Sequence, residues 1–311
     1  MAVHTPVPRD ALLAFLRPYG LPAPSLFEGI AAGVENTNYR LDAGGRALIL
    51  TLYEGRTQTA DLPYFLALTD HAAARGVPTP APLTRPDGTV VGALLGRPAA
   101  LVMRLPGETL DAPTEAQAHA AGRALARLHG ALSSFEGRRA DPLVHPVGWL
   151  ALARRLGSTH AHGPEAVAMA ERLAASWPRG LPVGPIHADL FPDNVLFAGD
   201  ALSGIIDPYF ASDGPLAYDL AVAMNAWMQE HPSGPDPARA AALRVGYEAV
   251  RPLTREERAA LPRLRCGAAL RFFLTRAEDA LARTASDLVK VKDPLPYLAL
   301  ARHQARAAEE G

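Results

Sequence analysis

HADLFPDN at residues 187–194, followed by GIID at residues 204–207, is the part of the sequence that decides the fold. The first stretch places an acid, Asp189, five positions before a carboxamide, Asn194. The second stretch ends in another acid, Asp207, which comes 13 positions after the carboxamide. The apolar residues between Asn194 and Asp207 predict a β-hairpin, so we expect these two side chains to meet at one end of it.

This spacing is typical of phosphoryl transfer from a nucleotide. In protein kinases the catalytic-loop acid is followed five positions on by an asparagine that binds Mg²⁺, and a second Mg²⁺-binding acid comes later. By this comparison Asp189 would orient an acceptor hydroxyl and take its proton, whereas Asn194 and Asp207 would hold Mg²⁺ against the phosphates. A chance arrangement of acids around a hairpin is the alternative, and it explains two matching spacings poorly.

Two other residues of the motif have competing interpretations. His187 and Asp189 lie on the same side of an extended segment, which would suit a metal pair, but no second histidine follows at a spacing typical of metal ligands. We therefore expect a ring nitrogen of His187 to tie the loop to nearby backbone. We expect Asp193 to be an exposed loop acid rather than a substrate contact.

The bulk properties favour a cytoplasmic globular protein of one large domain or two lobes. The 311 residues include 31 basic and 32 acidic side chains, so charge gives no reason to expect nucleic acid or an anionic membrane as a partner. The single cysteine, Cys266, fits a reducing compartment, and we expect it to be a buried structural thiol. No apolar run is long enough to span a bilayer, and no basic region marks a signal peptide.

The pattern of elements predicts an α+β fold with two lobes, as in protein kinases. We expect a small antiparallel sheet in a nucleotide-binding N-lobe, residues 1–105, and a larger, mainly helical C-lobe, residues 106–311, that carries the catalytic loop, metal site and substrate pocket. Pro106–Gly107 is the predicted boundary. Strands are predicted at 27–30, 34–41, 47–53, 90–95 and 98–105; helices are predicted at 10–17, 61–75, 114–137, 164–176, 215–230, 238–250, 256–283 and 295–309.

Lysine is nearly absent, which excludes two common ways of holding phosphates. The only lysines are Lys290 and Lys292, and no P-loop motif is present. Protein kinases use a lysine on the third strand, paired with a glutamate on the next helix. Here Thr51 occupies the lysine's place, and the predicted helix at 61–75 contains no glutamate. The chain is therefore either an inactive nucleotide-binding relic or an enzyme that holds phosphates by other groups.

We favour an active enzyme because the base and metal positions are intact. The loop Glu35-Asn36-Thr37-Asn38 offers amide and hydroxyl donors, and we expect Asn36 and Asn38 to contact the nucleotide. Glu35 is a candidate contact to the substrate. Arg40, Arg46 or Arg56 would add positive charge. The alternative for this loop is that its side chains only cap a turn and a strand.

Over nearly its whole length the chain resembles the bacterial homoserine kinases of the aminoglycoside-phosphotransferase-like (choline-kinase-like) superfamily. HADLFPDN and the later Asp207 are shared across the superfamily. Narrower stretches separate this chain from antibiotic and choline kinases: ENTNY (35–39), LTLYE (50–54), VRPLT (250–254) and LRFFLTR (270–276). The threonine in LTLYE is usual in this group, which weakens the relic interpretation.

The resemblance implies ATP-dependent phosphorylation of the L-homoserine side-chain hydroxyl, a step toward threonine. It implies that Asp189 is the base, that Asn194 and Asp207 bind Mg²⁺, and that Asp219 is a structural acid. It also implies that adenine hydrogen-bonds to backbone groups of the connector formed by Val102, Met103, Arg104 and Leu105. The one departure is Pro208, where the resemblance leads us to expect phenylalanine.

Homoserine carries an α-carboxylate and an α-ammonium group, so its pocket needs a cation and an acid or carbonyls. Arg271 and Arg276 are candidates for the carboxylate, because arginine binds carboxylates through two parallel hydrogen bonds. The alternative for both is a solvated helix face or a salt bridge to Glu278 or Asp279. Asn225 is a further candidate for the pocket, and Trp227 is expected to belong to the core.

Two other functions remain open from the sequence. The acceptor would differ if the chain phosphorylated another amino alcohol, a methylthio-sugar or an aminoglycoside; aminoglycosides need an acid-rich cleft, whereas an amino acid also needs a cation. A nucleotide-sensing module without catalysis would belong to another class of protein, and the missing lysine is its only support.

Overall fold

The computed structural model of the chain describes residues 5–30, 36–54, 57–282 and 292–310. The candidates Glu35 and Arg56 lie outside these described residues. The chain divides into two compact units. The sheet unit contains the residues up to Gly107 together with 135–137 and 203–209, and the helical unit contains the remainder. Asp207, which the sequence analysis placed in the C-lobe, is thus grouped with the sheet unit.

The sheet unit is built on a five-stranded antiparallel sheet, as predicted. Its order is β1-β2-β3-β5-β4, and all neighbouring strands run antiparallel. Gly44 and Gly45 join β2 to β3 with φ values of 58° and 73°, in the left-handed region that glycine adopts without strain. The strands are β1 (Leu26–Gly29), β2 (Asn36–Ala43), β3 (Arg46–Tyr53), β4 (Gly92–Leu94) and β5 (Arg97–Met103).

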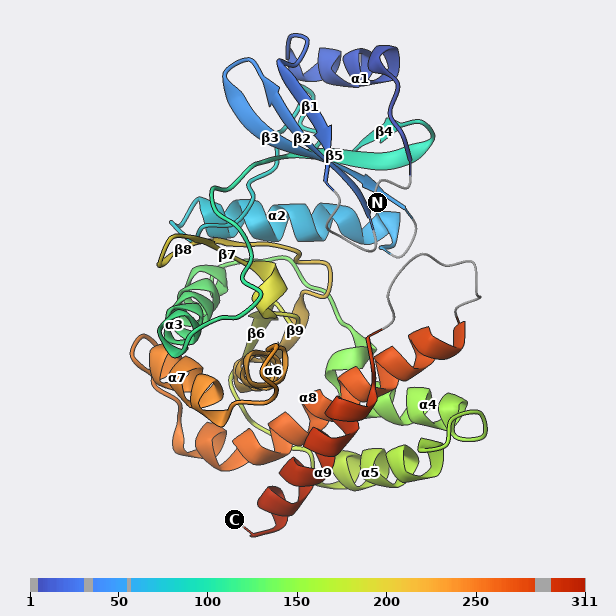
Figure 1. The fold of residues 1–311 in the computed structure, drawn as a ribbon, viewed down its shortest axis with the longest axis vertical. Helices are drawn as coiled ribbons and strands as arrows, with labels where there is room; N and C mark the ends of the chain where they lie inside the picture. Colours follow the sequence, from blue (N-terminus) through green and yellow to red (C-terminus); the bar gives the residue numbers. More distant parts are fainter. Residues whose placement is uncertain (1–4, 31–35, 55–56, 283–291, 311) are drawn as a thin grey trace. The chain divides into compact units, whose positions relative to one another are not determined.

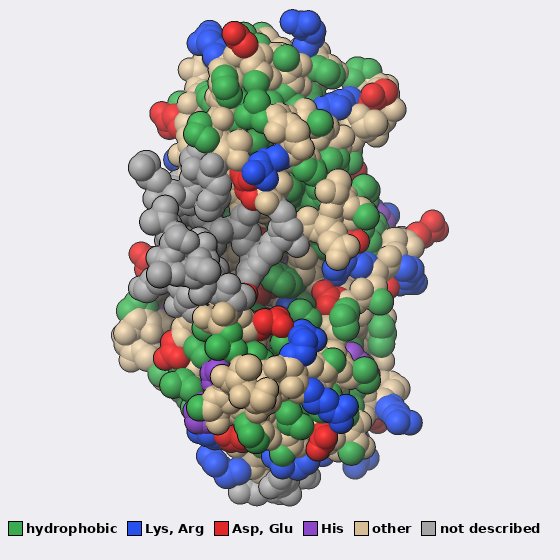
Figure 2. Space-filling view, turned by 90° about the vertical axis from the view of Figure 1, so that its right-hand side faces the viewer, with side chains coloured by type: hydrophobic (Ala, Val, Ile, Leu, Met, Phe, Trp, Pro, Cys, Tyr) green, Lys and Arg blue, Asp and Glu red, His purple; other side chains and the backbone are tan. Residues whose placement is uncertain are grey.

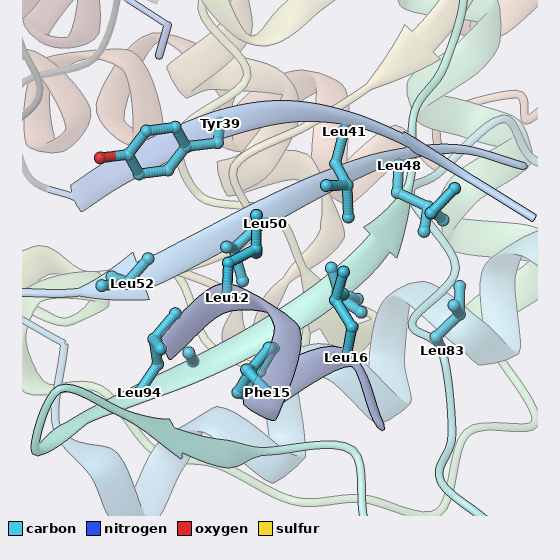
Figure 3. Packing of buried hydrophobic residues seen from close by; sticks show 13 residues of the cluster. Leu12, Phe15, Leu16, Tyr39, Leu41, Leu48, Leu50, Leu52, Leu83 and Leu94 are labelled. Carbon is cyan, nitrogen blue, oxygen red and sulfur yellow. The ribbon is translucent and has the colours of Figure 1, made fainter. Parts of the chain in front are cut away.

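A helix covers each face of this sheet (Figure 1). Because side chains alternate along a strand, Leu48, Leu50 and Leu52 of β3 point to the face covered by α1 (Arg9–Leu16). Figure 3 shows this cluster, in which leucines from β2, β3 and β4 surround Leu12, Phe15 and Leu16. Tyr53 points to the other face, where it packs with Leu62 and Leu66 of α2 (Leu62–Ala73).

The helical unit is organised around α6 (Leu216–Gln229), which is buried at every residue from Ala217 to Met228. A helix that is apolar on all sides belongs in a core, so α6 holds its few polar side chains in a fixed place. The other helices are α3 (Glu115–Leu132), α4 (Pro146–Leu156), α5 (Gly163–Ser176), α7 (Pro237–Glu248), α8 (Arg255–Ala282) and α9 (Leu295–Glu310).

Two short two-stranded sheets lie outside the five-stranded sheet. β6 (Val183–Ile186) pairs with β9 (Ser212–Pro215), and β7 (Val195–Ala198) pairs with β8 (Ala201–Ile205). The second pair is the predicted hairpin. The chain passes from the helical unit to the sheet unit within β8.

Glycines let α3 and α7 approach closely. A Cβ atom at Gly246 would lie 2.0 Å from the carbonyl oxygen of His119, and one at Gly122 would lie 1.9 Å from that of Leu243. No other residue fits this contact without separating the helices. The contact fixes α7 against α3, and both helices contribute residues to the site described below.

The structure differs from the predicted elements in three places. Helix α4 was not predicted, because Pro142, Pro146 and Gly148 suggest a loop. The strands β6 and β9 were not predicted either, because their glycines and prolines are unusual in strands and their partners lie 26 to 32 positions apart in the sequence. The predicted capping box of Thr114 and Gln117 is confirmed, but α3 ends at Leu132 rather than near Gly137.

Two expectations from the bulk properties can be compared with the structure. Cys266 is buried, and its thiol donates to the carbonyl oxygen of Ala301, so its role as a structural thiol is confirmed. In the described part of the chain, every helix is too short or too polar to cross a bilayer. Figure 2 shows acidic and basic side chains intermixed over the visible face, in keeping with their nearly equal numbers.

Candidate active site

The predicted catalytic loop, residues 187–194, connects β6 to β7 within the helical unit. The amide nitrogen of Asn194 donates to the backbone oxygen of Asp189 at 2.8 Å and to its carboxylate at 3.1 Å. The acid and the carboxamide, five positions apart, are thus in direct contact. Because the amide nitrogen of Asn194 faces Asp189, its amide oxygen remains as the atom to face a cation.

Ala188, directly before the acid, has a φ of 61°. A non-glycine residue in this left-handed region costs on the order of 1–3 kcal/mol, so the surrounding structure must hold it there. Its N–H donates to the carboxylate of Asp219 at 2.7 Å, and its carbonyl oxygen accepts from Arg271 at 2.6 Å. Because both its N–H and its carbonyl group are held, Ala188 fixes the orientation of the backbone that carries the side chain of Asp189.

Asp219 is the centre of a buried network. Its carboxylate is fully buried and accepts from the backbone N–H groups of His187 and Ala188, at 2.8 and 2.7 Å. It also contacts Nε2 of His129 at 2.9 Å. Burial by itself would raise the pKa of Asp219, but the contacts with His129 and His187 outweigh it and lower that pKa. The predicted scaffold role of Asp219 agrees with these contacts, and the loop is tied through the backbone of His187.

Sequence reasoning missed the second half of this network. Nδ1 of His129 contacts the hydroxyl of Tyr247 at 2.7 Å, and Arg251 donates to the same hydroxyl at 3.3 Å. Arg251 also pairs with the buried Glu257 at 2.9 Å. Burial raises the pKa of Tyr247, so this group remains a neutral hydroxyl. The sequence feature that could have indicated this part of the network is the VRPLT stretch, residues 250–254, which contains Arg251 and to which no role had been assigned.

Arg271 holds the catalytic loop and does not face solvent. It is only 2% exposed, and its guanidinium lies between the rings of Phe210 and Phe272, at 5.3 and 4.7 Å from their centroids. Neither alternative from the sequence, a solvated face or a salt bridge to Glu278 or Asp279, describes it. Its contact with the backbone of Ala188 makes it part of the scaffold, and we do not carry a substrate role for it forward.

Asn225 and Trp227, on α6, also belong to the scaffold. The amide of Asn225 is fully buried, accepting from Nε of Arg265 at 2.9 Å and donating to that residue's carbonyl oxygen at 2.8 Å. Its donor and its acceptor are thus both engaged away from the catalytic loop. The indole of Trp227 is buried and donates to the carbonyl oxygen of Leu190, so its expected place in the core is confirmed.

Arg276 is paired with an acid that the sequence analysis did not consider. Its guanidinium lies 2.6 Å from the carboxylate of Glu230 at the end of α6, and 4.4 Å from the ring centroid of Tyr297 on α9. Its side chain is 12% exposed and that of Glu230 is 29% exposed, so solvent reaches both. The salt-bridge alternative for Arg276 thus holds with a different partner, Glu230, and Glu278 pairs with Arg155 instead.

In the sheet unit, Asp207 follows β8 with a φ of 61°. Two residues later, the hydroxyl of Tyr209 donates to that of Tyr53 at 3.2 Å, and the ring of Tyr209 packs edge-on against Phe65 of α2. Burial raises the pKa of Tyr53 to about 12, and the charge of Asp207 adds to this rise. This cluster of aromatic side chains ties the segment that carries Asp207 to β3 and α2.

Thr51 takes the place of the kinase lysine on β3. It lies opposite Asn38 and donates to its side-chain oxygen at 2.7 Å. The side-chain oxygen of Asn36 accepts from the N–H of Glu54 at 3.3 Å. Both asparagines therefore have the cross-strand role that was the alternative for this loop, which leaves their amide nitrogens as the atoms to donate to a nucleotide.

The connector after β5 offers fewer backbone donors than expected. The N–H of Met103 donates to Ala81, and the N–H of Arg104 donates to Ala47, at 2.8 and 3.0 Å. The N–H of Met103 is thus used within the sheet unit, so its predicted contact with adenine would have to come from its carbonyl oxygen. The N–H of Leu105, the residue after Arg104, is therefore a better candidate donor to adenine, together with the backbone of Val102.

The environment of Thr51 predicts that a lysine cannot be restored there alone. Thr51 is 5% exposed, and α2 supplies no glutamate to pair with a charge at this position. We expect Thr51→Lys to lower the free energy of unfolding by about 3 kcal/mol, because an uncompensated charge would be buried. Urea unfolding measures this, with Thr51→Ser as the control that keeps the hydroxyl. A Thr51→Lys variant as stable as the unmodified chain would disprove the explanation.

Comparison with known proteins places this geometry in context. Residues 26–253 match the model of a family described as "Phosphotransferase enzyme family". Two relatives named homoserine kinase are closely similar along almost the whole chain. One, from Rhizobium etli, is 46% identical over 96% of this chain and 94% of its own length. Another, from Xanthobacter autotrophicus, is 48% identical over 98% of this chain and 97% of its own length.

Solved structures share the fold at low sequence identity. A microcompartment-associated aminopropanol kinase has a TM-score of 0.64 and 18% identity, over 96% of each chain. A spectinomycin phosphotransferase in complex with ADP and spectinomycin also has a TM-score of 0.64, with 15% identity over 99% of this chain and 100% of that chain. At such identities the likeness establishes the predicted fold class and nothing about the acceptor.

Proposed function

Because this chain belongs to the phosphotransferase enzyme family, and within it to the group of relatives named homoserine kinase, we propose that it transfers the γ-phosphoryl group of ATP to the side-chain hydroxyl of L-homoserine. The product is O-phospho-L-homoserine, and the reaction takes place in the cytoplasm. The contact between Asp189 and Asn194 supports the proposal, because a carboxylate beside a carboxamide suits the roles of base and metal ligand that phosphoryl transfer needs.

In this mechanism Asp189 accepts the proton of the homoserine hydroxyl as the oxygen attacks the γ-phosphorus. The carboxylate is held in place by the amide of Asn194, and its backbone is fixed by the contacts of Ala188. Such positioning is most of what an enzyme contributes to phosphoryl transfer, since the reaction needs little covalent help.

Asn194 and Asp207 would hold Mg²⁺. One carboxylate and one amide oxygen suit this ion, which usually takes few protein ligands and completes its octahedron with phosphate oxygens and water. When bound, Mg²⁺ neutralises charge on the phosphates. The amide orientation of Asn194 supports this role, because its oxygen is the atom not used by Asp189.

Residues of the proposed nucleotide-binding lobe, residues 1–105, would hold the rest of ATP. The amide nitrogens of Asn36 and Asn38 would donate to phosphate oxygens in place of the kinase lysine. Backbone groups of Val102 and Leu105 would bind the adenine.

An acceptor panel tests the proposal. We expect ADP release that depends on both L-homoserine and Mg²⁺, with much lower rates for serine, threonine, choline and kanamycin. A coupled ADP-release assay measures this, with each acceptor omitted in turn as the control. Strong turnover of choline or kanamycin without turnover of homoserine would refute the proposed acceptor. ATP binding in a calorimeter without turnover of any acceptor would instead favour a nucleotide sensor.

A further inference from the structure

The ion pair of Glu230 and Arg276 belongs to the helical unit and has no role in the mechanism above. Glu230 follows the last turn of α6, and Arg276 lies on α8, so two helices present opposite charges at one place. The two side chains are 2.6 Å apart, and both are partly exposed. Solvent, and therefore a dissolved ligand, can reach both charged groups.

A chain of aromatic contacts connects this pair to the catalytic loop. The guanidinium of Arg276 lies 4.4 Å from the ring centroid of Tyr297. The ring of Tyr297 lies 6.4 Å from that of Phe191, which is two residues after Asp189 in the loop. Phe272 lies against both rings, at 5.4 and 4.8 Å. Four contacts thus connect the ion pair to the loop within the helical unit.

The charges around Tyr297 support this placement. Burial raises the pKa of the Tyr297 hydroxyl, the charge of Glu230 raises it further, and the charge of Arg276 lowers it. The carboxylate of Asp189 also contributes to the rise, so the base and the ion pair act on the same buried hydroxyl.

We propose that Glu230 and Arg276 form the subsite for the two charged groups of the acceptor, with Arg276 binding the α-carboxylate and Glu230 binding the α-ammonium. The inference rests on the proposed function. An α-amino acid carries both charges on one carbon atom, so the groups that recognise them must also be adjacent. A neighbouring cation and anion meet this demand, whereas an acceptor with only ammonium groups would need the acid alone.

Two truncated acceptors separate the charges of homoserine. 3-Aminopropan-1-ol lacks the carboxylate and keeps the ammonium and hydroxyl; 4-hydroxybutyrate lacks the ammonium and keeps the other two groups. For the unmodified protein and each variant we would measure kcat/KM for homoserine. For each truncated compound we would measure kcat/KM, or its inhibition constant against homoserine where it is not phosphorylated.

Arg276→Met is expected to lower kcat/KM for homoserine roughly 10–100-fold, the size of a lost hydrogen bond to a charged group, and to leave 3-aminopropan-1-ol nearly unaffected. Glu230→Gln is expected to lower kcat/KM for homoserine by a similar factor and to leave 4-hydroxybutyrate nearly unaffected. The matched controls are Arg155→Met and Glu278→Gln, which break a 2.9 Å ion pair that is exposed on both sides. These control variants should change neither the preference for homoserine over 3-aminopropan-1-ol nor the preference for homoserine over 4-hydroxybutyrate.

The possible results distinguish a failure of the proposed subsite from a failure of the proposed function. Equal losses for homoserine and for both truncated compounds would show that the pair is only structural, and would overturn the inference. If Arg276→Met does not fold, Arg276→Lys keeps the charge and loses the planar fork, and it should still weaken homoserine more than 3-aminopropan-1-ol. No turnover of homoserine by the unmodified protein would refute the proposed function itself.

Discussion

Replacing Asp189 by asparagine is expected to lower kcat with homoserine by about three orders of magnitude, within the range found for removal of a general base. An asparagine has nearly the same shape and can still accept from the amide of Asn194, so the loop should keep its conformation. The variant would lose the ability to take the hydroxyl proton. The KM values for ATP and homoserine should change little, because the substitution removes an interaction that develops in the transition state.

The matched control for this experiment is Asp193→Asn in the same motif. The carboxylate of Asp193 is 61% exposed and lies 3.2 Å from Lys292, as befits the exposed loop acid predicted from the sequence. Its loss should change kcat only slightly. Rapid-quench measurement of one turnover separates the chemical step from product release. A decrease of less than tenfold for Asp189→Asn, or equal decreases for the two variants, would remove Asp189 from the role of base.

Replacing Asp219 by alanine is expected to lower the free energy of unfolding by about 3–5 kcal/mol, as for other buried charges whose partner is removed. The backbone N–H groups of His187 and Ala188 would lose their acceptor in a place that water does not reach. The left-handed backbone at Ala188 would then be held by Arg271 alone, so kcat should fall as well. Denaturant unfolding and the ADP-release assay measure the two effects.

Glu171→Ala is the control for this variant. Glu171 forms a 3.3 Å surface pair with Arg154, and both side chains are more than half exposed, so its loss should change stability by less than about 1 kcal/mol. If Asp219→Ala were as stable as Glu171→Ala, the carboxylate would not be holding the loop.

The lowered pKa of Asp219 also predicts how stability depends on pH. A carboxylate with a lower pKa in the folded state stabilises the fold above its unfolded pKa, and that stabilisation is lost as pH falls through the folded pKa. The unmodified protein should therefore lose more stability than Asp219→Asn on acidification below about pH 4. Unfolding curves for both proteins at a series of pH values measure this difference. Parallel pH dependence would mean that Asp219 is not ionised in the fold.

Much of the site could be predicted because its signals are local in sequence. Asp189 and Asn194 are five residues apart, and their contact follows from a tight loop at the start of a hairpin. The strand pattern likewise identified the place of Thr51, because β2, β3 and β5 are consecutive antiparallel neighbours with glycine turns or alternating apolar residues. Such features depend on spacing and periodicity, which the sequence shows directly.

Other roles could not be predicted because they depend on contacts between distant residues. Arg271 lies 83 positions from Ala188, and Tyr247 lies 118 positions from His129. On its own helix, Arg271 resembles any other arginine beside apolar residues, and only the packing of α8 on the catalytic loop buries it. The same holds for Glu230, whose importance depends on the side chain of α8 that lies opposite.

By itself, the sequence determined the class of chemistry, the two-part α+β fold and the absence of a phosphate-binding lysine, since residue types at short spacing carry this information. The tertiary structure decided that Arg271 supports the loop and that Arg276 is partly exposed beside an acid. Burial is the physical reason. A charged side chain acquires its role from the partners that surround it when helices pack, and no spacing along the chain specifies those partners.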